Sequence, residues 1–207
     1  MKLQFLGAAR TVTGSHSYAA PKLYTVTLTV SDAAGASGQS VFRYAIVYNP
    51  ASGAGYLTGA GQVNSPAGAF TSNPGLAGAL TVSKITAKYG TDGTLGALTN
   101  AFNFSYTPGS LSFNSTSMRW LVVSGNQAWL KGEGWSNVSG VSDMCYFLVS
   151  IIDSSTSADK VRVKVWSKAT GVVVYDSLKD GAGASLYDDA PPTQTSTTGP
   201  SMVMILH

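Results

Sequence analysis

The segment from Tyr24 to Val30 alternates apolar residues with threonine, and this alternation limits what the chain can fold into. Successive side chains of a strand point to opposite faces of a sheet, so the threonines would occupy one face and the apolar residues the other. The pattern predicts a half-buried antiparallel strand. Its apolar row, which we expect to face a core or a neighbouring chain, consists of Tyr24, Val26, Leu28 and Val30.

The composition of the 207-residue chain favours strands and turns over helices. Charged residues make up 11% of the sequence, 23 residues are glycine, and Glu133 is the single glutamate. Exposed helix faces normally carry glutamate, lysine and arginine, so no amphipathic helix of ordinary length can be drawn. We therefore predict an all-β protein.

Turn signals divide the chain after residue 80 into short strands at regular spacing, which is typical of an antiparallel β-sandwich or jelly-roll-like fold. One hairpin is predicted to join residues 161–166 to 172–175, with Gly171 in the left-handed position that closes its loop. Residues 55–78 are rich in glycine and proline, and predict a surface excursion or a pair of short edge strands. The expected strands are 80–89, 101–106, 119–123, 128–134, 144–152, 160–166, 172–176 and 202–206.

Two parts of the sequence resemble known extracellular modules. Residues 12–32, above all 16–21 and 24–30, resemble the last two strands of a PKD-type β-sandwich domain. Several later segments resemble the domain that follows PKD repeats in secreted bacterial proteins, namely 44–50, 64–68, 113–123, 131–134, 159–166 and 173–176. This second resemblance covers residues 44–207. The resemblance implies an extracellular or cell-surface location, although no signal sequence is evident, and a modular, noncatalytic role.

This resemblance predicts a division into incomplete PKD-like strands with a linker (1–39) and a β-sandwich domain (40–207), with residues 33–39 as the linker. The earlier strands of a PKD module do not precede His16. If the protein is exported, we expect this chain to be a fragment of a longer precursor. A strand without its usual neighbours must pair elsewhere, because unpaired backbone groups are costly to bury. We therefore expect other protein domains or subunits to be partners through β-strand pairing.

Enzymatic activity is not expected. Residues 1–15 resemble the start of metallo-β-lactamase-fold RNA hydrolases, but that chemistry needs a cluster of metal-binding histidines, and the chain has only His16 and His207. Glycoside hydrolysis would need two carboxylates at a set separation. Nothing in the sequence brings Glu133 and Asp143 together, so no catalytic residue is assigned.

Two kinds of ligand site remain as candidates. Exposed aromatic residues bind sugars, and Trp135 and Tyr187 are the candidates for a polysaccharide site, whereas Trp120 and Trp166 are expected to be core or half-buried. Loop carboxylates often bind calcium in β-sandwiches. The candidate ligands are Asp176, Asp180, Asp188 and Asp189, with solvated turn aspartates as the alternative and no other cofactor expected.

The remaining features argue against other partners. The cations of residues 160–168 alternate along one strand without interleaved aromatic residues, so a nucleic-acid site is not expected. No apolar run is long enough for a membrane span. Cys145 lies in an apolar run and is expected to be buried and inert. The sequence thus predicts a noncatalytic extracellular module acting as spacer, in adhesion or in assembly; the alternative is a carbohydrate-binding accessory domain of a secreted enzyme.

Overall fold

The computed structural model describes residues 14–96, 99–138, 144–180, 182–197 and 203–206. Antiparallel strands dominate it, and the single helical element is a three-residue 3-10 turn, η1 (Thr107–Gly109). The predicted all-β, antiparallel fold is confirmed. The strands are β1 (Lys22–Ser31), β2 (Ser37–Val47), β3 (Tyr56–Ser65), β4 (Gly78–Lys88), β5 (Ala101–Tyr106), β6 (Leu111–Ser124), β7 (Gln127–Ser136), β8 (Cys145–Ile152), β9 (Lys160–Ser167), β10 (Val173–Asp176), β11 (Gln194–Thr195) and β12 (Val203–Leu206).

A ten-stranded sheet contains every strand from β3 onward, and β3 to β10 follow one another in it as antiparallel neighbours. The hairpin between β9 and β10 forms as predicted, with Gly171 at a φ of 72°. The expectation for residues 55–78 was wrong. They contain β3, a ten-residue strand that pairs with β4 on one side and β12 on the other.

The C-terminal tail links the two ends of this meander. Gln194 in β11 pairs with Val161 of β9, and Ser196 then forms a bridge with Val63 of β3. The backbone N–H of Thr197 donates to the carbonyl of Gln62 at 2.8 Å. The tail therefore covers edge positions of both β9 and β3, which would otherwise expose unpaired backbone groups.

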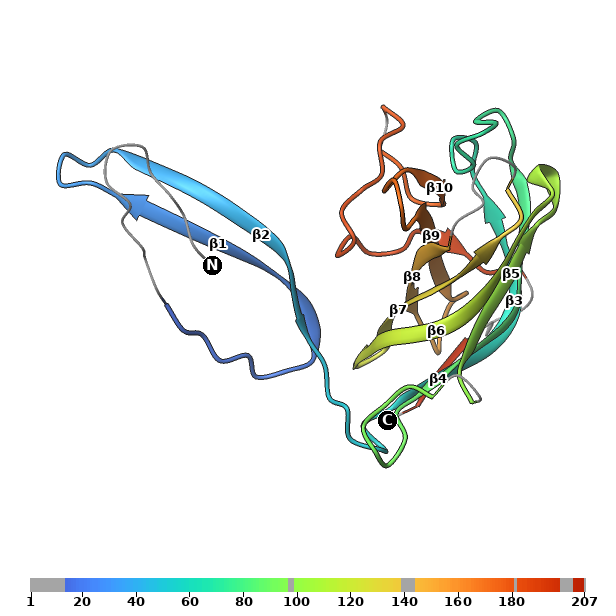
Figure 1. Cartoon of the computed structure of the whole chain (residues 1–207), viewed down its shortest axis with the longest axis horizontal. Coiled ribbons are helices and arrows are strands. Elements are labelled where there is room, and N and C mark those ends of the chain that lie inside the picture. The colour runs from blue at the N-terminus through green and yellow to red at the C-terminus, as the bar shows by residue number, and fades with distance from the viewer. Residues whose placement is uncertain (1–13, 97–98, 139–143, 181, 198–202, 207) are drawn as a thin grey trace.

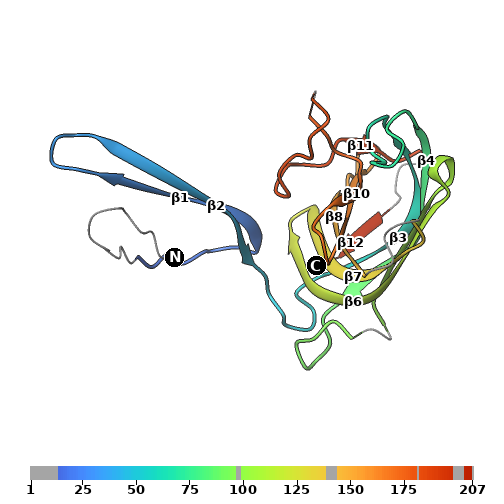
Figure 2. The same cartoon turned by 45° about the horizontal axis from the view of Figure 1, so that its top comes forward.

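Strong curling of the sheet encloses an aromatic core (Figure 2). Phe102 of β5 lies 4.9 Å from Phe147 of β8, and Phe104 of β5 lies 5.9 Å from Tyr175 of β10, between ring centroids. Two walls thus face each other as in a sandwich, but they belong to one continuous sheet. Cys145 faces this core and is fully buried, as predicted.

Two glycines of β7 allow the sheet to curl tightly. A Cβ on Gly132 would lie 2.2 Å from the carbonyl oxygen of Ser117, and one on Gly134 would lie 2.3 Å from that of Asn114. The rings of Phe147 and Phe113 fill the space beside these glycines. Only glycine lets backbone and ring approach so closely.

The hairpin of β1 and β2 forms a separate two-stranded sheet that extends away from the curled sheet (Figure 1). Its turn is closed by Asp32, whose carboxylate accepts hydrogen bonds from the backbone of Ala34 and Ala36 at 2.9 Å. The expected linker thus forms this turn and the start of β2. The boundary suggested at residues 39 and 40 falls inside β2, which pairs with β1 along its whole length.

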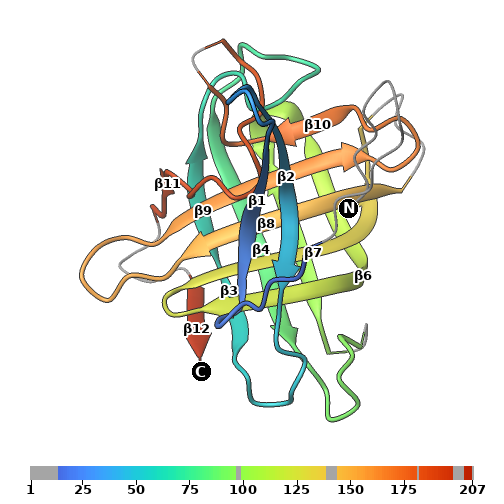
Figure 3. The same cartoon turned by 90° about the vertical axis from the view of Figure 1, so that its left-hand side faces the viewer.

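The base of the hairpin packs on the outer face of the curled sheet. Leu23, which is 3% exposed, joins a small apolar cluster with Ile46 and five residues of the sheet, Trp120, Val122, Trp129, Leu148 and Trp166. Seen from the hairpin side, β1 and β2 cross over the middle strands of the sheet (Figure 3). The hairpin therefore covers part of this outer face.

Candidate functional site

Beside the base of the hairpin, this outer face collects charged and aromatic side chains from four adjacent strands. The face lies over β6 to β9, where Glu133, Tyr146 and Trp166 are register partners across β7, β8 and β9. Lys131, Leu148 and Lys164 form the next row. We define the cation–aromatic face as Arg119, Lys131, Glu133, Tyr146, Lys164, Trp166 and Lys168.

Glu133 is an ion-pair centre on this face. Its carboxylate accepts hydrogen bonds from Arg119, with Nε at 2.7 Å, and from Nζ of Lys168 at 2.5 Å. The bond from Lys168, together with Arg119, holds the pKa of Glu133 below its usual value although burial opposes this shift. Glu133 is thus a charged structural residue that holds two cations. Asp143, which was considered with Glu133 as a carboxylate pair for glycoside hydrolysis, lies outside the described residues.

Asp188 is the second carboxylate at this face, and it ties a C-terminal loop to the sheet and the hairpin. It accepts hydrogen bonds from Nζ of Lys164 at 2.7 Å and from the hydroxyl of Tyr44 in β2 at 2.5 Å. Burial, and then the bond to Asp188, raise the pKa of the Tyr44 hydroxyl. Asp188 is therefore engaged by a cation and a hydroxyl from two different sheets.

Lys131 stands among three aromatic rings. Its Nζ lies 5.1 Å from the ring centroid of Trp166, 5.7 Å from that of Tyr146 and 5.9 Å from that of Tyr44. Among the described residues it forms no ion pair within 4 Å. Burial lowers its pKa. The charge of Asp188 opposes this shift, and the charges of Arg119 and Lys164 add to it.

Arg162, on the same strand as Lys164, is fully buried and pairs with Asp176. Its Nε and one terminal nitrogen donate to the two carboxylate oxygens at 3.0 and 2.9 Å. The terminal nitrogens also donate to the carbonyls of Leu186 and Tyr187 at 2.7 and 2.6 Å. This network holds the loop that carries Asp188 against β9.

The four aspartates considered for calcium each have a different environment. Asp176 binds Arg162 and Asp188 binds Lys164. Asp180 accepts bonds from the backbone of its own turn, and Asp189 accepts one from Thr25 of β1 at 2.8 Å. Within the described part of the chain, no three acidic, histidine or cysteine side chains are grouped as metal ligands.

The two candidate aromatic residues occupy different settings. Trp135 is 50% exposed and lies on β7, with its side chain on the outer face two positions beyond Glu133. Tyr187 is 59% exposed, but the guanidinium of Arg43 lies 3.7 Å above its ring. Trp166 is half-buried and Trp120 is buried, as expected.

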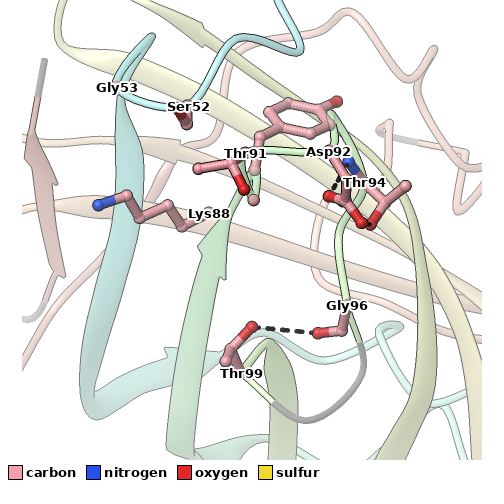
Figure 4. A pocket seen from close by; sticks show the side chains of 10 residues that line it. Ser52, Gly53, Lys88, Thr91, Asp92, Thr94, Gly96 and Thr99 are labelled. Carbon is pink, nitrogen blue, oxygen red and sulfur yellow. Dashed lines mark hydrogen bonds between the residues drawn. The ribbon is translucent and has the colours of Figure 1, made fainter.

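A depression of about 760 Å³ lies beside the end of β4, apart from these residues (Figure 4). The carboxylate of Asp92 in its wall accepts bonds from the backbone and hydroxyl of Thr94. The hydroxyl of Tyr89 bonds the backbone of Leu121, and that of Thr99 donates to the carbonyl of Gly96. Local turns thus use these polar groups, and no reactive set is formed.

Two features of the sequence lie outside the described residues, namely the hydrolase-like segment 1–13 and His207. His16 is exposed and packs edge-on against Tyr18, with ring centroids 4.6 Å apart.

Comparisons with protein-family models, curated proteins and solved structures gave no match to this chain. In the described part of the chain, no helix has the length and apolar character needed to cross a membrane.

Sequence reasoning missed the cation–aromatic face because its residues come from four strands. Along residues 160–168 alone no aromatic residue separates the cations except Trp166. The rings of Tyr146 and Tyr44 come from β8 and β2. One signal was available: every second residue of β7, from Trp129 through Lys131 and Glu133 to Trp135, points to the same face. The sequence does not show which residues of β9 lie near them, because that depends on the register of the strands.

Proposed function

We propose that this chain is a noncatalytic module that joins a second copy of itself through strand β1. The observation that carries the proposal is the projecting hairpin, in which β1 pairs only with β2 among the described residues. An extracellular or cell-surface setting is supported by the resemblance to PKD-associated domains. A noncatalytic role is supported by the engagement of Glu133 and Asp188 in ion pairs.

Beyond its base, the hairpin lacks the support that a two-stranded sheet normally needs. An isolated hairpin is marginally stable in water, and stability usually requires a third strand or a packed layer. Leu23 at its base is buried, whereas Val26, Leu28 and Val30 are only half-buried and alternate with exposed threonines. A neighbouring strand would cover this apolar row and satisfy the free backbone groups at the same time.

The outer edge of β1 is well suited to receive such a strand. It contains no proline or glycine, and its one charge, Lys22, stands at the first position. Natural edges are usually protected by charges, prolines or bulges. β2 carries Gly38 and Arg43, and the irregularity in the pairing adds its extra residue to β2. These differences favour β1 over β2 as the pairing edge.

A second copy fits this edge because antiparallel pairing of two identical strands creates a two-fold axis, the commonest symmetry of soluble oligomers. The apolar rows of the two β1 strands would then lie side by side on one face. Directly opposite side chains in such a pair are about 4.5–5.5 Å apart, close enough for contact.

Light scattering during size-exclusion chromatography over a concentration series tests the proposal. The wild type should form dimers as its concentration approaches about 1 mM, where a Kd of that size corresponds to about −4 kcal/mol. Leu28→Asp should remain monomeric, because two carboxylates would meet at the apolar row. Val41→Asp, on β2, should still dimerise. A wild type that stays monomeric throughout, or a Leu28→Asp variant that dimerises equally well, would contradict the proposal.

A second candidate function, carbohydrate binding, is favoured by the outer face of β7. Trp135 is half exposed there, on the same side of β7 as Lys131 and Glu133. Aromatic side chains with one apolar face and fixed position are common in recognition sites. Tyr187 does not extend this surface as a free ring, since Arg43 covers it.

A further inference from the structure

We infer that the cation–aromatic face binds an acidic polysaccharide through its carboxylate or sulfate groups. This inference names a ligand class and a site that differ from the β1 edge, and it does not depend on dimerisation.

The cation–aromatic face carries an excess of positive charge. Arg119, Lys131, Lys164 and Lys168 stand there with two carboxylates, Glu133 and Asp188. Both carboxylates already bind cations from the same face. The face therefore attracts anions locally, although the net charge of the whole chain is only +3.

Lys131 is the cation of this face that has no carboxylate in direct contact among the described residues. Its ammonium group lies near three rings, in a partly buried position. Charged groups taken out of water are normally paired. An anionic group of a ligand would supply a countercharge in direct contact, and burial would strengthen that pair relative to one in open water. The lowered pKa of Lys131 agrees with this desolvated setting, in which the charge of Asp188 offsets burial only in part.

The cation–aromatic face is also rigid and extended. The cations come from β6, β7, β9 and the residue after β9, and hydrogen-bonded strands hold them in fixed register. Trp166 and Tyr146 lie between them, with ring centroids 5.8 Å apart, and Trp135 extends the same side of β7. Such a surface can meet several anionic sugars along a chain while aromatic edges contact the sugar rings.

The same observations disfavour the two other common polyanions. Single-stranded nucleic acids need aromatic faces free for base stacking, whereas lysines stand over Trp166 and Tyr146 here. Extended acidic peptides usually add a strand to a free sheet edge. The cation–aromatic face lies in the middle of the sheet, where the backbone groups of β7 and β8 are already paired on both sides.

Calorimetric titration at physiological salt tests the inference with dextran sulfate, polygalacturonate and uncharged dextran. We expect both acidic polymers to bind and dextran not to bind. Lys131→Met, which keeps the unbranched apolar stem and removes the charge, should weaken binding about tenfold, as expected for the loss of one charge-assisted contact. Lys131→Arg should retain binding.

The matched control is Lys84→Met, which removes the same charge from an exposed position on β4. It should change affinity less than about twofold, since at about 8 Å of screening length a distant charge contributes little. The monomeric Leu28→Asp variant should bind like the wild type, which separates this test from that of dimerisation.

Several results would overturn the inference: no binding of either acidic polymer, equal binding of dextran, or equal losses in Lys131→Met and Lys84→Met. Binding of oligo(dT) or poly-glutamate as tight as that of polygalacturonate would show that the ligand class is wrong.

Discussion

Among single residues, Arg162 has the most demanding environment. Its side chain is 1% exposed and donates four hydrogen bonds, two to Asp176 and two to backbone carbonyls of the following loop. Buried ion pairs add little net stability compared with an apolar pair, but removing one partner leaves an uncompensated charge. Arg162 therefore determines whether the loop with Asp188 stays on the sheet.

Replacing Arg162 with methionine should lower the free energy of unfolding by about 3–5 kcal/mol, because Asp176 would remain buried and unpaired. Lys160→Met, at an exposed position of the same strand, should cost less than about 0.5 kcal/mol. Urea denaturation followed by tryptophan fluorescence measures both values. Nearly equal stabilities of the two variants would show that the buried pair is not needed.

Among the elements, the β9–β10 hairpin and strand β3 show which parts of the fold can be predicted from the sequence. Local patterns sufficed for the β9–β10 hairpin, since Gly171 and the flanking valines lie close together in the chain. They failed for β3, whose Gly59 and Gly61 weaken the strand signal, and which is stabilised by pairing with β4 and with the distant β12. Local patterns did not predict the cation–aromatic face either, because the register between strands is a long-range property.

The glycines of β7 provide a test at this scale. Gly132→Ala should destabilise the protein by more than about 1 kcal/mol, because its Cβ would overlap backbone and the Phe147 ring. Gly38→Ala in β2 should be neutral or slightly stabilising, since no atom lies within 4 Å of the position that its Cβ would occupy. Thermal unfolding followed by circular dichroism compares the two. A tolerated alanine at position 132 would mean that the sheet can curl without a close approach there.

For the whole molecule, buried tyrosines predict that stability falls at alkaline pH. Burial raises the pKa of Tyr89 from 10.0 to about 12, and it also raises those of Tyr44 and Tyr175. Above pH 10 the unfolded chain loses these protons while the native protein keeps them, so the free energy of unfolding falls with rising pH. Burial also raises the pKa of Tyr106. Lys131 acts in the opposite direction because its pKa is lowered, but it is one group against four.

We expect urea midpoints to be steady from about pH 8 to 9.5 and to decline between about pH 10 and 12, with Tyr89 alone contributing about 2 kcal/mol of the loss by pH 12. Absorbance titration of the native protein should show that Tyr89 ionises only near pH 12, well above the ordinary tyrosine value. Stability that rises over this range would mean that the tyrosine hydroxyls are accessible in the native state.

The most direct test of the central claim is disulfide trapping of the β1–β1 pair. Single cysteines are introduced at each position from Thr25 to Thr29, and at Val41 of β2 as control; the native Cys145 is buried and should not react. In an antiparallel two-fold pair, the residue on the axis faces its own copy with Cα atoms about 4.5–5.5 Å apart, which is within disulfide range. We expect rapid covalent dimerisation at the position on the axis and none at Val41. Failure at every position from 25 to 29, or equally fast dimerisation at Val41, would contradict the β1–β1 pair.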